Sequence, residues 1–171
     1  MRFKYFRDPD NFAHKIEESL ACSICNTEGH WFDAASFYGV HEIACICDRC
    51  LAAGKLEPLG IATNEALGSN TEDLKTIIHR TPPLPTWQDQ IWPIMNGEYC
   101  VFEKIASKTD FDNKAAFTGA FSKEDQTSTD LDWLWNKLPE EPVANLAQGN
   151  FTVSVYLFSC HGIQLCTWDM A

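Results

Sequence analysis

The chain has 171 residues, and its 24 acidic and 13 basic side chains give a formal net charge of −11. This length fits one domain with a core large enough to fold without disulfide staples, and a hydrophobic content of 45% excludes a disordered chain. No apolar run reaches the roughly 18 residues of a membrane helix, and the excess of carboxylates disfavours nucleic-acid binding and suits a basic partner.

The N-terminal segment contains charged and aromatic residues and predicts a short extended stretch at residues 3–6. It lacks the apolar region of a secretory leader, so we expect a cytoplasmic protein without a membrane partner. In a reducing compartment, the eight cysteines are expected to be metal ligands and buried thiols rather than four disulfides.

The region 22–50 is predicted to contain strands and turns, with a helix starting near residues 48–53. It holds two C-x-x-C pairs, Cys22 with Cys25 and Cys47 with Cys50. The two-residue spacing lets both thiolates of a pair bind one ion, and two such pairs form a closed tetrahedral site. The sequence therefore predicts a zinc-knuckle subregion with one structural Zn²⁺ ion. Zinc is favoured over iron because no redox motif accompanies the cysteines.

Other ligand sets remain open at this stage. Cys45 could replace Cys47, and His30 or His41 lies close enough in sequence to compete. The cysteines could also be buried reduced thiols that pack like small hydrophobic residues. We favour Cys47 because its spacing repeats that of the first pair, whereas Cys45 lies in an apolar stretch typical of a buried strand.

Residues 56–70 contain one proline and two glycines and are predicted to be an internal linker within one domain spanning residues 1–171. Thr71 is expected to cap a helix that ends near Arg80, before two prolines. A second helix is predicted from an N-cap at Thr86, because the following apolar residues have helical spacing. These apolar residues are Trp87, Ile91 and Trp92.

The rest of the chain is predicted to contain a strand near residues 99–102, a helix after Asp130 that ends at Pro139, and a strand at 151–158. That strand has one apolar face and one mixed face. Its apolar face is predicted to contain Phe151, Val153, Val155 and Leu157. A short turn leads into a final strand, so we expect an α+β fold with an antiparallel sheet ending in a C-terminal hairpin.

The second half holds a group of residues that could form a further site: Cys100, Cys160, His161 and Cys166. They could make a second metal site, or a thiol nucleophile with His79 or His161 as its base. Their spacings match no ligand pattern, and the chain carries no hydrolase or phosphate-binding motif. We therefore expect core thiols and a protein that is not an enzyme. A thiol- or metal-dependent enzyme at this group is the alternative.

The negative charge is concentrated in residues 110–141, which hold eight acidic and three basic side chains. Aromatic residues lie among these carboxylates, a composition typical of surfaces that attract and bind a basic protein. The predicted partner-binding residues are Asp110, Asp112, Glu124, Asp125, Asp130 and Asp132. Alternatively, the aromatic residues face the core and the carboxylates are only solvated. The zinc region has one basic and four acidic residues, so a zinc-containing nucleic-acid-binding module is disfavoured.

Several short motifs together resemble the CbrC family of small bacterial proteins, over nearly the whole chain. They are Phe3-Lys4-Tyr5 with Asp8-Pro9, the two C-x-x-C pairs with Leu51-Ala52-Ala53-Gly54, Arg80-Thr81-Pro82, Trp87-Gln88 with Trp92, Tyr99-Cys100-Val101-Phe102, and Tyr156 to Cys160. The family tends to have His-Cys where Met95-Asn96 stand here, and a C-x-x-C of which only Cys160 is matched. The resemblance supports the first metal site and not a second one.

The resemblance implies a function in colicin tolerance or toxin immunity. With the acidic stretch, it gives the leading hypothesis of a non-enzymatic immunity protein. Such a protein would use a structural zinc site and an acidic face to neutralise a basic bacterial toxin, expected to be a nuclease.

Overall fold

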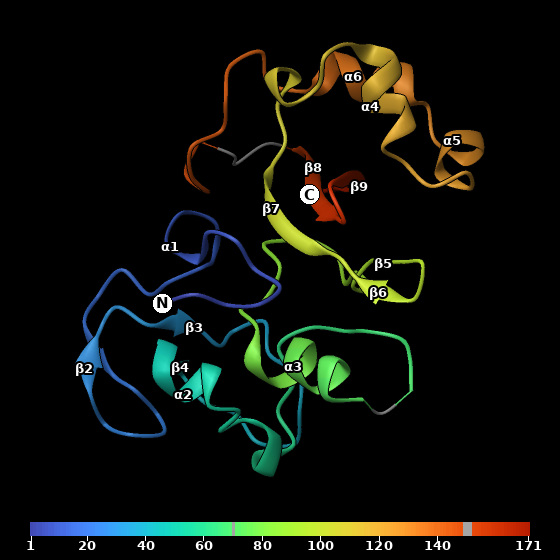
Figure 1. The fold of residues 1–171 in the computed structure, drawn as a ribbon. Coiled ribbons are helices and arrows are strands. Elements are labelled where there is room, and N and C mark those ends of the chain that lie inside the picture. Colours follow the sequence, from blue (N-terminus) through green and yellow to red (C-terminus); the bar gives the residue numbers. More distant parts are fainter. Residues whose placement is uncertain (70, 149–151) are drawn as a thin grey trace.

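The computed structural model describes residues 1–69, 71–148 and 152–171. Its centre is a three-stranded antiparallel sheet in the order β7-β8-β9, formed by Val101–Ile105, Val153–Cys160 and Ile163–Met170 (Figure 1). β8 and β9 form the predicted C-terminal hairpin, paired from Val153 opposite Met170 to Cys160 opposite Ile163. His161 and Gly162 turn the chain, both with positive φ, as a tight two-residue hairpin turn requires.

Each face of this sheet is covered by its own hydrophobic core. Tyr156 and Phe158 of β8 point into a first core shared with the N-terminal half, whereas Val155 and Leu157 point into a second core. On the predicted mixed face, Ser154, Tyr156 and Phe158 are all buried, so the structure covers this face as well as the apolar one. Phe151, placed on the apolar face by the sequence pattern, lies outside the described residues.

A helical layer, residues 106–138, covers the second core (Figure 1). It contains η2 (Lys108–Asp110), α4 (Lys114–Gly119), α5 (Asp125–Ser128) and α6 (Leu131–Lys137). The Asp130 carboxylate accepts the Trp133 amide at 2.9 Å, so the predicted N-cap of α6 is confirmed. Within the described ranges, no helix has the length and apolarity needed to cross a membrane.

The N-terminal half packs on the opposite face of the sheet (Figure 1). Its elements are α1 (Pro9–Phe12), β1 (Leu20–Ala21), β2 (Glu28–Gly29), β3 (Phe32–Asp33), β4 (Cys45–Ile46), α2 (Asp48–Ala52), η1 (Glu57–Leu59) and α3 (Glu72–Arg80). Thr71 caps α3 as predicted, accepting the Leu74 amide. The predicted extended segment at residues 3–6 forms one parallel bridge, Phe6 with Phe102, at the free edge of β7.

The segment 56–70, predicted to be an internal linker, contributes the buried side chains of Leu56 and Ile61 to the first core. Its last residue, Asn70, lies outside the described part of the chain. Tyr99 and Phe102, predicted to lie in one strand, belong to two strands that are separated at Cys100. β5 (Ile94–Met95) and β6 (Glu98–Tyr99) form a small hairpin, and β7 begins at Val101.

The helix predicted from Thr86 does not form, and the segment to Trp92 is irregular. The amides of Trp87 and Gln88 donate to the buried carboxylate of Asp169 in β9, at 2.7 and 3.2 Å. The Trp92 indole is buried and donates to the Cys100 carbonyl. The Trp92 amide donates to the carbonyl of Glu65 at 2.7 Å and not to the Gln88 carbonyl as in a helix, so a tertiary contact replaces the local helical pattern.

Candidate metal centre

The first cysteine pair lies in a tight turn between β1 and β2. The Cys22 amide donates to the Thr27 carbonyl, and the Asn26 amide donates to the Cys22 carbonyl, both at 2.9 Å. Asn26 has a φ of 60°, a left-handed conformation that asparagine tolerates better than most residues. This turn folds the chain back within six residues and brings the Cys22 and Cys25 thiols to one side.

The second pair lies at the start of α2. Cys47 is the N-cap in an extended conformation, and Cys50 is in the first helical turn, which brings both thiols to the same end of the helix. The strand before it is fixed to the first pair, since the Ser23 hydroxyl oxygen accepts the amides of Ala44 and Cys45. The two C-x-x-C segments are therefore held together by hydrogen bonds, in addition to the proximity of their sulfur atoms.

The four sulfur atoms of Cys22, Cys25, Cys47 and Cys50 lie within 4.8 Å of one another. A tetrahedral zinc site with Zn–S bonds of about 2.3 Å requires sulfur atoms about 3.8 Å apart. The Cys25 and Cys47 sulfurs are 3.7 Å apart, and the Cys47 amide donates to the Cys22 sulfur at 3.3 Å. The donor set and spacing therefore fit one tetrahedral metal ion.

The four thiols differ in solvent exposure. Cys25 is exposed, and hydrogen bonds with Thr27 lower its pKa to about 6, whereas burial raises the pKa of Cys47 and Cys50. Ionising buried thiols is costly unless a cation is bound, so a divalent ion would offset the charge of the cluster. Four thiolates and one such ion carry about two negative charges, which does not suit phosphate binding.

The competing ligands lie outside this cluster. Cys45 is buried in β4, its thiol donates to the Ala21 carbonyl at 3.3 Å, and burial raises its pKa. His30 and His41 are exposed, and neither belongs to the group of converging sulfurs. The structure therefore places Cys47, and not Cys45, with the other three cysteines.

The second group of candidate residues does not converge on one point. Cys100 and Cys160 share the first core, whereas Cys166 lies in the second core on the other side of the sheet. His161 is exposed in the hairpin turn and pairs with Glu98 at 2.7 Å. Cys160 and Cys166 are separated because side chains alternate along a strand, and these two point to opposite faces of the sheet. Cys100 comes close to Cys160 only through the register of β7 on β8, which the sequence does not reveal.

The predicted partner-binding carboxylates fall into two groups. The exposed ones are Asp112, Glu124, Asp130 and Asp132. Asp110 is only 15% exposed and accepts hydrogen bonds from Lys104 and Ser107, and Asp125 accepts one from Ser122. The phenylalanines between them, Phe111, Phe117 and Phe121, are buried in the second core, so they stabilise the helical layer and do not face a partner.

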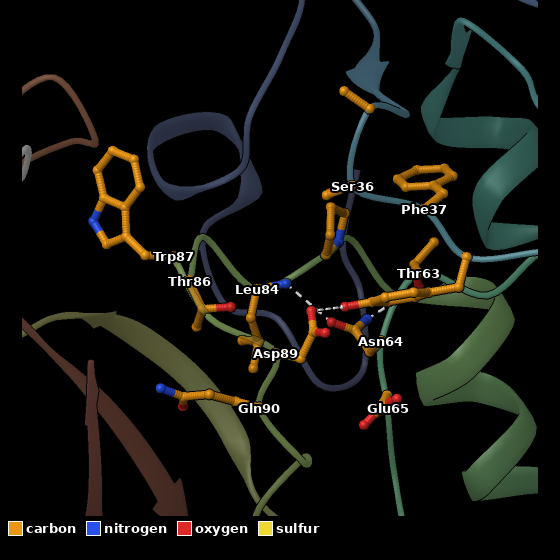
Figure 2. Close-up of a pocket in the computed structure, with 13 residues that line it drawn as sticks. Ser36, Phe37, Thr63, Asn64, Glu65, Leu84, Thr86, Trp87, Asp89 and Gln90 are labelled. Atoms are coloured by element: carbon orange, nitrogen blue, oxygen red, sulfur yellow. Dashed lines mark hydrogen bonds between the residues drawn. The ribbon is translucent and has the colours of Figure 1, made fainter. Parts of the chain in front are cut away.

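A polar pocket of about 260 Å³ opens between residues 35–38, 63–65 and 83–90 (Figure 2). Its wall depends on Asn64, whose amide group donates to main-chain carbonyls and whose oxygen accepts the Leu84 amide at 2.9 Å. Glu65 and Asp89 are its charged lining residues, and the Asp89 carboxylate accepts the Tyr38 hydroxyl. Trp87 points away from Asn64 (Figure 2). The pocket therefore has hydrogen-bonding and acidic character.

A protein-family profile described as an uncharacterised protein family, UPF0167, matches residues 1–170. This match covers the four-cysteine cluster, the central sheet and the helical layer. No solved structure matches the chain.

Proposed function

We propose that this chain, which belongs to the UPF0167 family, is a non-enzymatic binding protein that holds one structural zinc ion and recognises a basic protein. The observation that carries the proposal is the separation of two features across the sheet. The four cysteines lie in the N-terminal half, and the most acidic stretch forms the helical layer on the opposite face. Stabilisation and recognition are thus assigned to different parts of one fold.

The metal part of the proposal rests on the donor set. Four thiolates fill all positions of a tetrahedral ion and leave none for a substrate, which is the arrangement of structural zinc sites. We expect protein purified without chelator to contain about one equivalent of zinc by elemental analysis. Protein with intact fold and no bound zinc under these conditions would contradict this assignment.

The binding part rests on charge. Residues 110–141 carry a net charge of −5, and four of the predicted carboxylates are exposed: Asp112 before α4, Glu124 before α5, and Asp130 and Asp132 at the start of α6. The negative electrostatic potential of these carboxylates accelerates association with a basic protein and disfavours association with an acidic protein. The acidic pocket near Asp89 adds a second place where a cationic side chain of the partner would be favoured.

The narrower form of the proposal is that the partner is a bacterial toxin domain, such as a basic nuclease, in the cytoplasm. It rests on the resemblance to the CbrC family and on the charge argument. The test is a pull-down of toxin domains encoded beside the gene. If no neighbouring gene encodes such a domain, or if none of the domains binds, the immunity role fails while the zinc site is unaffected.

Reversing two exposed charges of the helical layer, with Asp112→Lys and Glu124→Lys together, should slow association with a basic partner about tenfold at low salt. The reason is the loss of attraction, since neither side chain supports the core. Binding is measured by stopped-flow or surface plasmon resonance at two ionic strengths.

The matched control is Glu17→Lys with Glu18→Lys, which changes the net charge equally at exposed positions of the N-terminal half. Equal slowing in both double variants would show that only the total charge matters, and would remove the helical layer as the binding face.

A further inference from the structure

Cys100 and Cys160 are cross-strand neighbours. β7 and β8 pair antiparallel with Val101 opposite Ser159, and one step further the same register sets Cys100 opposite Cys160. Both side chains lie on the face of the sheet that points into the first core. The proximity also affects protonation, since burial and the neighbouring Cys160 raise the pKa of Cys100 to about 12.

The main-chain bonds identify the type of pair. The Cys100 amide donates to the Pro93 carbonyl at 3.0 Å, and the Cys100 carbonyl accepts the Trp92 indole at 2.8 Å. Neither group of Cys100 bonds Cys160, which makes this a non-hydrogen-bonded pair of an antiparallel ladder. Such pairs have Cα atoms about 4.5 Å apart. This separation falls within the range of about 4.4–6.8 Å that disulfides span.

One of the two thiols faces a cavity. A cavity of about 650 Å³ is lined by Cys160 together with residues of the N-terminal segment, the β5–β6 turn and the hairpin turn, among them Tyr5, Gly97, Tyr99 and His161. Cys100 is not among its lining residues and has no exposed surface, whereas Cys160 is 6% exposed. A small molecule entering the cavity would therefore meet Cys160 first and find Cys100 behind it.

We propose that Cys160 and Cys100 form a thiol–disulfide exchange site for low-molecular-weight disulfides of the glutathione type. The Cys160 thiolate attacks one sulfur of the reagent and gives a mixed disulfide, and one thiol leaves with a proton. The neutral Cys100 thiol then loses its proton as its sulfur attacks the Cys160 sulfur, and the proton leaves with the second thiol. Two protein thiols are thereby oxidised to one cross-strand disulfide, and the reagent's disulfide is reduced to two thiols.

The test uses the zinc-loaded full chain, incubated with increasing ratios of oxidised to reduced glutathione. Samples are quenched in acid, alkylated under denaturing conditions and mapped by mass spectrometry. We expect a cross-linked peptide pair containing Cys100 and Cys160, six of the eight cysteines still alkylatable, and an unchanged zinc content. Alkylation of both Cys100 and Cys160 at the most oxidising ratio would overturn the proposal.

Single substitutions distinguish Cys160, which attacks the reagent, from Cys100, which resolves the mixed disulfide. Cys100→Ser should stop at one glutathionyl group on Cys160, whereas Cys160→Ser should leave Cys100 unmodified. Cys166→Ser is the matched control, because Cys166 is equally buried but lies in the second core, and it should give the wild-type cross-link. Circular dichroism establishes that each variant is folded. A glutathionyl group found on Cys100 in the folded Cys160→Ser variant would contradict the assigned order of attack.

Discussion

A Cys22→Ser variant is expected to lose its metal and the order of the N-terminal half. Cys22 is fully buried, its sulfur accepts the Cys47 amide, and it is one of four converging ligands. Structural zinc contributes about 10–16 kcal/mol of binding free energy in zinc-finger peptides, and β1 to β4 are each only two residues long. Phe32 and Ile46 also pack into the first core, but two-residue strands form few ladder hydrogen bonds, so the ion is expected to supply much of the stability of this region. Zinc content should fall from about one equivalent to near none, with rapid proteolysis of residues 15–50.

The control is Cys45→Ser. Cys45 is as deeply buried as Cys22 and adjacent to the same cluster, but its thiol points to the Ala21 carbonyl. We expect this variant to keep its zinc and to lose about 1 kcal/mol of stability. If Cys45→Ser loses zinc and Cys47→Ser retains it, the ligand assignment must be exchanged between these two residues.

Replacing Asp169 by alanine is expected to lower the free energy of unfolding by about 2–4 kcal/mol. The buried Asp169 carboxylate accepts the Trp87 and Gln88 amides and the Tyr156 hydroxyl, the last at 2.8 Å. Burial and the neighbouring carboxylate raise the pKa of Tyr156, which keeps its hydroxyl protonated as a donor. Alanine would remove the acceptor of the Trp87 and Gln88 amides and one acceptor of the buried Tyr156 hydroxyl, and the segment at Trp87 would detach from β9.

Urea unfolding followed by tryptophan fluorescence measures this change. The matched control is Asp112→Ala, which removes an exposed carboxylate and should change stability by less than about 0.5 kcal/mol. Equal stability of the Asp169→Ala variant and wild type would show that water replaces the carboxylate, and that other contacts hold the segment 85–92 in place.

Much of this protein is specified by short-range patterns. The two C-x-x-C pairs identify the candidate ligands because the turn and the helix start that present them are each built within six residues. Thr71 and Asp130 identify the starts of α3 and α6 because an N-cap bonds an amide only three residues away. The C-terminal hairpin follows from a long strand pattern and a turn at Gly162, since antiparallel pairing across a two-residue turn is also local.

The tertiary structure decided the features that depend on partners far away in sequence. The pattern from Thr86 has helical spacing, yet the Trp92 amide, which a helix would bond to the Gln88 carbonyl, donates to the carbonyl of Glu65 at 2.7 Å, and Ile91 forms a bridge with Glu65. Alternation along β8 shows which side chains share a face, but not that both faces are covered. Cys100 and Cys160 likewise become neighbours only through the β7–β8 register. Local sequence fixes caps, turns and knuckles, whereas packing of distant segments determines what is buried and which thiols meet.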